Sequence, residues 1–447
     1  MIKDLLSKRT NRPLIEYQGR SITDTEFACQ VESILTSIPT SSKERCYLID
    51  MEEPIEFFTT LFALWQANAK VIFPTRDHFL GKQIFSHYTH RVLYKNKSIE
   101  IIENPDYTEI DGLNEVDFDS VVFSSGSTGT PKGIVHVKQH FLDNAQATAN
   151  AMGQTEFTGI TMLKPYLVSA LSHFLVHYIT GSLLIFSDLD HIDSLPGVLE
   201  THENCAIVGS PMHILMSLAK ISPDYKPKFF FTSGDFIYKN SITSILTKFP
   251  ESIFFKVYGL AELAGRFFIQ PVSSTMSNEV IDAIGENIEG IEYEIREGEL
   301  FVKSDYLFRG YIRNGIFEPS LEWHATGDMV KTDRGVMVLA GRNDDEIKVG
   351  GNKVSLKHIE SKVAEVLPET AIAVVPQEHP TLGNLICLVF EGDCGYGRAE
   401  LLSKLRGRLE NNELPHKYYS MESFPFTQTM KIDRKEIGGR LKDLKPL

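Results

Sequence analysis

The sequence has few cysteines and no hydrophobic run of membrane-spanning length. No stretch of eighteen apolar residues occurs anywhere in the chain, and the N-terminal segment MIKDLLSKRTNRP contains no apolar stretch of signal-peptide length. The five cysteines are odd in number and widely spaced, a pattern that argues against a disulfide framework or a zinc site. They are Cys29, Cys46, Cys205, Cys387 and Cys394. We therefore expect a cytoplasmic protein with free thiols and no membrane partner.

The sequence also lacks an excess of positive charge. It has 45 Lys and Arg against 59 Asp and Glu, which gives a formal net charge of −14. Such an acidic balance argues against a surface for nucleic acid or anionic membrane. It does not argue against a nucleotide, because a local cradle can be positive on an acidic protein. No internal repeat, heptad pattern or low-complexity tract is present.

The first two thirds of the chain alternate short apolar runs with helical patterns. The run Cys46–Ile49, a helix that begins at Pro54, and the run Val71–Phe73 form one βαβ pattern. This pattern predicts parallel sheets covered by helices. Four later strands are expected at Leu183–Phe186, Ala206–Val208, Phe229–Phe231 and Ile253–Tyr258, with helices at Met212–Ala219 and Ser241–Lys248.

The pattern changes after Gly285, where alternating residues predict antiparallel strands at Glu299–Lys303 and Gly335–Leu339. A chain of 447 residues is long enough for more than one hydrophobic core. The charged run from Gly341 to Lys353 marks a change of composition and indicates the domain boundary. Beyond it we expect two helices and two strands, at Leu356–Val366, Ala399–Leu409, Ala371–Val375 and Leu385–Phe390. The predicted fold class is α/β: a large domain (1–341) of βα-layered parallel sheets with a small β-rich subdomain, followed by a small mobile α+β domain (342–447).

One Gly- and Ser-rich stretch, VVFSSGSTGTPKGIVHV at 121–137, separates two apolar runs. Glycines let the backbone approach a ligand, hydroxyls donate hydrogen bonds, and a lysine adds a cation, so the stretch predicts a phosphate cradle. The candidate binding residues are Ser124, Ser125, Gly126, Ser127, Thr128, Gly129 and Lys132. A P-loop is excluded, because only two residues separate Gly129 from Lys132 and Gly133 follows the lysine. A plain solvated turn is the simpler alternative.

Four later motifs join this loop in the same order as in a known family. They are YGLAE (258–262), TGD (326–328), GR (341–342) and KIDR (431–434). With the loop, they resemble the adenylate-forming superfamily of acyl- and aryl-CoA synthetases, peptide-synthetase adenylation domains and luciferases. The resemblance extends over nearly the whole chain. It departs from the family pattern at Ala261, where threonine is usual, and at Met430, where glycine is usual.

The resemblance implies a role for each motif, with ATP and Mg²⁺ as cofactors. Tyr258, with Gly259 and Ala261 beside it, would stack on adenine, and Glu262 would bind Mg²⁺ together with Thr128. The turn FTSGDF would frame the adenine through Gly234 and Asp235. Asp328 and Arg342 would hold the ribose and phosphates, and Lys431 would bridge the attacking carboxylate and the α-phosphate. Each residue also has a plainer explanation in isolation, such as a strand-end turn or a surface lysine.

The family works in two steps, between which the small domain rotates. The resemblance makes Asp344 the hinge and places Lys348 with Gly350-Gly351 on the segment that faces the thiol in the second step. Lys132, Glu262, Lys348 and Lys431 are therefore the candidate catalytic residues.

In the family that these motifs resemble, peptide-synthetase adenylation domains have an aspartate after the signature loop that pairs with the α-ammonium group of the substrate. The matching stretch here, Lys164–Gly181, contains no carboxylate, so the resemblance implies that an amino acid is not the substrate. The candidate pocket residues are Tyr166, Ser169, Ser172, His173, Gly209, Ser210, Pro211 and Met212. They predict an uncharged aryl or medium acyl group, although a core histidine satisfied by its neighbours explains His173 equally well. The predicted function is an AMP-forming acid–thiol ligase, and the acceptor, coenzyme A or a carrier protein, is left open. The alternative is a degenerate nucleotide-binding homologue without turnover.

Overall fold

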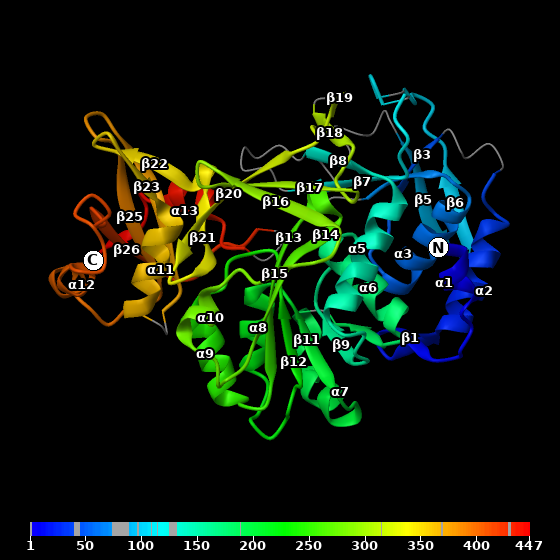
Figure 1. The fold of residues 1–447 in the computed structure, drawn as a ribbon, viewed down its shortest axis with the longest axis horizontal. Helices are drawn as coiled ribbons and strands as arrows, with labels where there is room; N and C mark the ends of the chain where they lie inside the picture. Colours follow the sequence, from blue (N-terminus) through cyan, green and yellow to red (C-terminus); the bar gives the residue numbers. More distant parts are fainter. Residues whose placement is uncertain are drawn as a thin grey trace.

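The structure is a computed structural model that describes residues 2–39, 45–73, 89–95, 98–108, 110–113, 115–124, 132–187, 189–313, 315–367, 370–427 and 431–447. It has the predicted α/β class, with helices packed around several sheets (Figure 1). No helix within these ranges is long and apolar enough to cross a bilayer.

The largest sheet has a parallel centre with antiparallel strands at its edges. Its strands lie in the order β15-β14-β13-β12-β11-β9-β10-β1-β2, and those from β13 to β1 are parallel. Their bounds are β1 Pro13–Tyr17, β2 Arg20–Thr23, β9 Thr158–Thr161, β10 Leu184–Phe186, β11 Cys205–Gly209, β12 Phe229–Thr232, β13 Ile253–Leu260, β14 Gly265–Val272 and β15 Glu286–Asn287. The four apolar runs expected in this region are β10 to β13.

A second sheet contains the predicted βαβ unit. Its order is β19-β18-β8-β7-β4-β3-β5-β6, and β3 pairs with β4 in parallel across α3 (Pro54–Gln66). Its strands are β3 Cys46–Ile49, β4 Lys70–Ile72, β5 His90–Lys95, β6 Ser98–Ile102, β7 Ser120–Ser124, β8 Lys132–His136, β18 Gly310–Arg313 and β19 Ile316–Pro319. The loop expected to cradle phosphate therefore joins β7 to β8, which pair antiparallel.

Helices fill the space between these two sheets. Helix α3 is apolar around most of its circumference, and all its residues from Pro54 to Trp65 except Glu56 are buried. Phe58 on α3 stacks on Phe174 of α6 with ring centroids 4.1 Å apart, and both belong to one core that reaches both sheets. The helices of this part are α1 Ile2–Ser7, α2 Asp24–Leu35, α5 Lys138–Ala151, α6 Val168–Thr180, α7 Leu195–Thr201, α8 Pro211–Leu218, α9 Lys239–Lys248 and α10 Asn278–Asp282.

An antiparallel sheet, β16-β17-β20-β21, follows where the sequence changes character. Its strands are β16 Ile291–Arg296, β17 Glu299–Ser304, β20 His324–Asp333 and β21 Val336–Arg342. Two of them, β17 and β21, are the antiparallel strands expected from alternation.

The last hundred residues have hydrophobic cores of their own. Their sheet runs β23-β22-β25-β26-β27, with β24 also paired to β25. The elements are β22 Glu346–Val349, β23 Asn352–Ser355, α11 Leu356–Val366, β24 Ile372–His379, β25 Gly383–Glu391, α12 Arg398–Leu405, β26 Lys417–Met421, α13 Arg434–Arg440 and β27 Lys445–Pro446. Helix α12 ends four residues before the expected end. The separate cores agree with a boundary near residue 341, although the division into domains stays a prediction.

Candidate active site

Parallel pairing brings three sequence motifs to one edge of the large sheet. Strands β11, β12 and β13 are parallel neighbours, so their carboxyl ends lie together. Ser210 follows β11, the turn with Gly234 and Asp235 follows β12, and Tyr258 lies near the end of β13. Ligands of open α/β sheets bind at such an edge. The edge is therefore where a site is expected.

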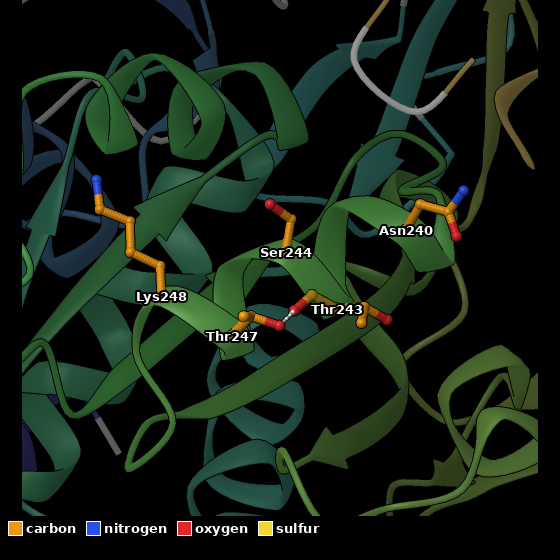
Figure 2. Close-up of a pocket in the computed structure, with 5 residues that line it drawn as sticks. All are labelled: Asn240, Thr243, Ser244, Thr247 and Lys248. Carbon is orange, nitrogen blue, oxygen red and sulfur yellow. Dashed lines mark hydrogen bonds between the residues drawn. The ribbon is translucent and has the colours of Figure 1, made fainter.

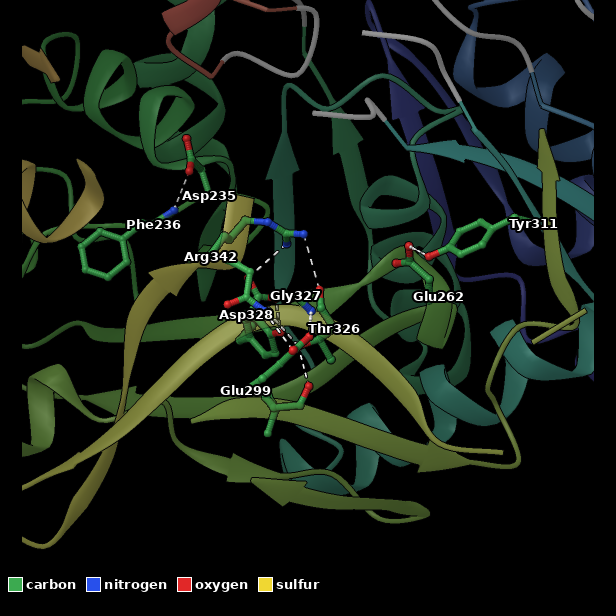
Figure 3. Close-up of polar contacts among 12 residues, drawn as sticks. Asp235, Phe236, Glu262, Glu299, Tyr311, Thr326, Gly327, Asp328 and Arg342 are labelled. Atoms are coloured by element: carbon green, nitrogen blue, oxygen red, sulfur yellow. Dashed lines mark hydrogen bonds and ion pairs between the residues drawn. The ribbon is translucent and has the colours of Figure 1, made fainter. Parts of the chain in front are cut away.

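Tyr258 reaches the antiparallel sheet and contacts Asp328 of the TGD motif, which is paired with Arg342 of the GR motif (Figure 3 shows Asp328 and Arg342). Its Oη donates a 2.5 Å hydrogen bond to Oδ2 of Asp328, and Nη1 of Arg342 donates a 3.0 Å bond to Oδ1. Asp328 and Arg342 are register partners on β20 and β21. Burial and the Asp328 carboxylate raise the pKa of the Tyr258 phenol well above its ordinary value. Residues 258, 328 and 342, far apart in sequence, thus form one polar cluster.

The TGD turn is fixed by residues that carry no motif. The backbone N–H of Gly327 donates to Oε1 of Glu299 at 2.9 Å, and Oε2 of Glu299 accepts from Asn343 at 2.9 Å. Gly327 has φ +77°, and a Cβ there would lie 2.9 Å from Nη2 of Arg342, so the turn requires glycine. Neither Glu299 nor Asn343 could be recognised from the sequence, because their partners are set by how the strands and the turn after β21 pack together.

Glu262 and Lys132 gather around a tyrosine that the sequence analysis missed. Tyr311 on β18 donates a 2.7 Å hydrogen bond from Oη to Oε1 of Glu262, as Figure 3 shows. The Nζ of Lys132 lies 4.5 Å from the centroid of the same ring. Burial and the Glu262 carboxylate raise the pKa of Tyr311. Three elements, η3 (Ala261–Leu263), β8 and β18, thus supply a carboxylate, a cation and a phenol to one spot.

Buried polar side chains hold the YGLAE turn from behind. Nδ2 of Asn144 donates to the carbonyls of Leu263 (3.1 Å) and Arg266 (2.7 Å), and its Oδ1 accepts from the N–H of Arg266 (3.0 Å). Nε2 of His136 lies 2.8 Å from the carbonyl of Ala261, and its Nδ1 lies 3.0 Å from Nδ1 of His140. Burial lowers the pKa of His136 to about 3, so the ring is neutral and donates to that carbonyl. The turn is therefore fixed without the usual threonine.

The lysine near the C-terminus reaches the same cluster. The charges of Asp235, Arg342 and Asp328 act on Lys431, whose pKa is lowered by burial. Close behind it in the chain, Arg434 donates from Nε (2.8 Å) and Nη2 (2.7 Å) to the buried carboxylate of Glu360 on α11. This pair fixes the segment that presents Lys431.

The other candidates from the last hundred residues lie elsewhere or are not fully described. Lys348 is exposed on β22, and its carbonyl accepts a 3.1 Å hydrogen bond from Asn384. The backbone of Asp344 lies in η4 (Asn343–Asp345), and its side chain is not described. In this arrangement, Lys431 and not Lys348 is the lysine at the cluster.

The acid-pocket candidates lie along the same edge, but several are engaged by neighbours. Tyr166 is buried, Ser169 on α6 is partly exposed, and a Cβ at Gly209 would clash with Cβ of His213 at 2.7 Å. Oγ of Ser210 lies 2.8 Å from Nδ1 of His213 and caps α8. His173 is buried against Nη2 of Arg266, 2.7 Å from Nδ1. This placement favours the second explanation of His173, a histidine satisfied in the core.

Two further regions are candidates for parts of the site. Ser125, Gly126, Ser127, Thr128 and Gly129 lie outside the described residues, and of Ser124 only the backbone, at the end of β7, is described. A depression of about 600 Å³ lies along α9, lined by Asn240, Thr243, Ser244, Thr247 and Lys248 (Figure 2). It contains none of the candidate residues, so we do not assign it to the site.

The chain is similar to known proteins over most of its length. The sequence model of the family described as "AMP-binding enzyme" matches residues 88–312. A 2-succinylbenzoate–CoA ligase of Staphylococcus epidermidis is 22% identical over 454 residues, which cover 96% of this chain and 94% of the relative. A D-alanine–D-alanyl carrier protein ligase of the same species is 24% identical over 97% of this chain and 90% of its own.

Solved structures share the fold. The o-succinylbenzoate CoA synthetase of Bacillus subtilis, solved with its acyl-adenylate intermediate, aligns with a TM-score of 0.79 at 18% identity, over 98% of this chain and 97% of that one. ATP-bound MatB of Rhodopseudomonas palustris aligns with a TM-score of 0.80 at 16% identity, over 99% and 98%. At these identities the likeness establishes the fold alone.

Proposed function

Because this chain belongs to the AMP-binding enzyme family, we propose that it is an AMP-forming acid–thiol ligase. The enzyme activates a carboxylic acid with ATP and then transfers the acyl group to a thiol. The proposal accounts for the charged and aromatic cluster around Tyr258, Asp328 and Arg342 at the sheet edge. It also accounts for the lysine that the C-terminal segment brings there.

In the first half-reaction, a carboxylate oxygen of the acid attacks the α-phosphorus of ATP. The new P–O bond forms while the bond to pyrophosphate breaks, so the products are an acyl-adenylate and pyrophosphate. Both reactants are anions, and catalysis requires cations where negative charge develops. Lys431 supplies one such cation, and Lys132 at the start of β8 supplies a second near the phosphates.

Asp328 and Arg342 hold the ribose side of the nucleotide. A carboxylate has two acceptor oxygens and suits a vicinal diol. We assign the Tyr258 ring, whose Oη reaches Asp328, to stacking on the adenine. Binding of ATP therefore either breaks the hydrogen bond from Tyr258 to Asp328 or leaves the Asp328 carboxylate shared between Tyr258 and the ribose hydroxyls.

The site suits Mg²⁺ held jointly with phosphates. Magnesium binds through one or two carboxylates together with substrate phosphates and water. Glu262 offers a carboxylate whose Oε1 is oriented by Tyr311. No cluster of three His, Cys, Asp or Glu side chains suitable for a metal occurs in the described ranges. The ion would neutralise phosphate charge, and Glu262 would hold it in place.

In the second half-reaction, the thiol sulfur attacks the acyl carbon and the bond to the AMP oxygen breaks. The products are a thioester, AMP and a proton. The acceptor is coenzyme A or the phosphopantetheine of a carrier protein, since relatives of similar identity carry names of both kinds. For this step we propose that the last hundred residues rotate about Asp344, which would bring Lys348 to the site in place of Lys431.

The five free cysteines agree with a reducing cytoplasm.

The observation that carries the proposal is that the partly buried Lys431 lies within electrostatic reach of Asp235, Arg342 and Asp328. A degenerate homologue would have no reason to keep a partly buried lysine at that spot. Burial of a cation costs free energy unless its charge is used or paired.

The test is acid-dependent exchange of labelled pyrophosphate into ATP over a panel of aryl and acyl acids. The released thioester is then identified with coenzyme A and with carrier proteins in separate reactions. Exchange with at least one acid supports the ligase. Nucleotide binding without any exchange over the panel would establish the degenerate alternative instead.

A further inference from the structure

A buried arginine beside the YGLAE turn has no carboxylate partner in the described part of the chain. Arg266 on β14 is 4% exposed. Its Nη2 faces the ring of His173, 2.7 Å from Nδ1 and 3.1 Å from Nε2. Its Nη1 is buried and makes no hydrogen bond to a described residue. Buried polar groups in native proteins almost always have partners, so this guanidinium requires an explanation.

Loose packing of the backbone does not provide that explanation. Asn144 on α5 accepts from the N–H of Arg266 at 3.0 Å and donates to its carbonyl at 2.7 Å. Arg266 also pairs with Gly259 across β13 and β14. The backbone of residue 266 is thus held on both sides, and the side chain starts from a fixed point.

Further buried polar atoms around Arg266 lack partners as well. Oγ of Ser172 on α6 makes no hydrogen bond to a described residue, and it lies next to β14, because a Cβ at Gly265 would be 3.2 Å from it. One turn later on α6, Nδ1 of His177 donates to the carbonyl of His173 at 2.7 Å, and its Nε2 has no described partner. An incomplete cluster of this kind indicates a missing polar group.

The missing group is an anion rather than a neutral acceptor. Burial lowers the pKa of Arg266 to about 9, so the guanidinium still carries its charge at pH 7. Burial and the Arg266 charge hold the pKa of His173 well below its ordinary range, so that ring stays neutral and accepts from Arg266 through its unprotonated nitrogen. A buried cation without a counter-ion is strongly destabilising, and a carboxylate would offset that cost.

The cluster lies where the acid is expected. Arg266 follows Glu262 by four residues, and Ser172 lies on the helix that also carries Ser169 (Figure 1, α6 beside β14). Resting on the proposed function, we infer that Arg266 and Ser172 bind a second carboxylate of the acid substrate. The substrate is then a dicarboxylic acid, activated at one end and held at the other, and not the uncharged acid expected from the sequence.

The experiment compares pairs of acids that differ only in the second carboxylate. Suitable pairs are adipate with hexanoate, suberate with octanoate, and 2-succinylbenzoate with 2-butanoylbenzoate. Pyrophosphate exchange gives kcat/KM for each acid. We expect at least one dicarboxylate to exceed its partner by about 100-fold, because a site built for a charged group rejects the analogue that lacks it.

Variants assign that preference to the cluster. Arg266→Met should lower kcat/KM for the preferred dicarboxylate by about 100-fold and leave the paired monocarboxylate unchanged or improved. Ser172→Ala, which preserves the arginine, should lower it by about 10-fold and covers the case in which Arg266→Met fails to fold. Arg296→Met, which removes an exposed arginine on β16, is the matched control and should change neither acid.

The outcomes separate this inference from the proposed function. Exchange that favours monocarboxylates, or a dicarboxylate preference that survives in both Arg266→Met and Ser172→Ala, overturns the inference and leaves the ligase intact. No exchange with any acid overturns the ligase and the inference together. Stabilisation of the ATP-free protein by the preferred dicarboxylate, lost in Ser172→Ala, would give support that does not depend on turnover.

Discussion

Replacing Tyr238 by phenylalanine should slow the first half-reaction and spare the second. Tyr238, at the N-terminal end of α9, packs against the core of the last hundred residues. Its Oη donates a 3.0 Å hydrogen bond to Oε2 of Glu360, the carboxylate that also holds Arg434. The bond therefore links the large part of the chain to the segment that presents Lys431. If the last hundred residues rotate between the two steps, only the arrangement with Lys431 at the site keeps this bond.

The size of the loss in the Tyr238→Phe variant depends on the hydrogen bonds that Glu360 keeps. A hydrogen bond to a charged group contributes about 1.5–3 kcal/mol. In the variant, Glu360 still accepts from Arg434 and from the N–H of Val374 (2.9 Å), and Lys357 lies 3.2 Å from Oε2. The loss should thus be near the lower limit, about 1.5 kcal/mol, or about tenfold in the population of this arrangement. The phenyl ring keeps the packing, so the thermal midpoint should change little.

Two assays measure the two half-reactions separately. Pyrophosphate exchange reports the first, and single-turnover thioester formation from supplied acyl-adenylate reports the second. We expect a three- to tenfold loss in exchange, as the population estimate implies, and no loss in thioester formation. Tyr225→Phe is the control, because Tyr225 donates a 2.7 Å bond to Glu200 within the same part of the chain. Equal slowing of both half-reactions, or unchanged exchange, would refute the assignment of Tyr238 to this interface.

Three further predictions concern the same site and its surroundings. Lys431→Ala should cut pyrophosphate exchange by about 10²–10³-fold and leave thioester formation from supplied acyl-adenylate largely intact. The control, Lys435→Ala at an exposed position near the C-terminus, should affect neither reaction. Exchange by Lys431→Ala at the wild-type rate would remove Lys431 from the mechanism. Asp328→Asn should raise the KM for ATP about tenfold through loss of a charge-assisted contact, and Asp333→Asn, exposed at the end of the same strand, should not. Burial lowers the pKa of His136 to about 3 and of His140, His177 and His213 to about 4, so between pH 6.5 and 4 the unfolded chain binds more protons than the folded one. The free energy of unfolding should therefore decrease as the pH is lowered below 6.5, by up to about 1.4 kcal/mol per pH unit per histidine. A urea midpoint that stays unchanged from pH 7 to 5.5 would contradict the burial of these rings in their neutral form.

The local sequence pattern was enough to predict several of the helices and strands. The run at Cys46–Ile49 and the amphipathic pattern at Leu356–Val366 coincide with β3 and α11, because apolar period and flanking caps decide such elements locally. The motif residues Tyr258, Asp328 and Arg342 meet because each lies near the end of a strand or at a register position in neighbouring sheets. The α/β class and the family resemblance were both confirmed.

Side chains that support the motifs could not be predicted in the same way. Asn144 holds a turn more than a hundred positions away, and Tyr311 meets Glu262 from another sheet. Neither residue type nor spacing distinguishes them from an ordinary helix asparagine or strand tyrosine. In the sequence, Arg266 is one charged residue in an apolar strand. Only the structure shows that it is buried without a carboxylate partner among the described residues.

The choice between the two lysines of the last hundred residues shows where local reasoning ends. Lys348 and Lys431 both lie in polar segments with glycines or charged residues nearby. The local composition of these segments does not indicate which lysine faces the nucleotide. Contacts made elsewhere decide it: Tyr238 with Glu360, and Asn240 with the carbonyl of Ala364 at 3.1 Å, set α11 against the large part of the chain. Glu360 then fixes Arg434 and, with it, the segment of Lys431. A few hydrogen bonds of this kind are worth only a few kcal/mol, which is the range in which a ligand can shift a two-state arrangement. If the last hundred residues rotate between the two half-reactions, the interface around Glu360 should therefore set how populated the arrangement with Lys431 at the cluster is.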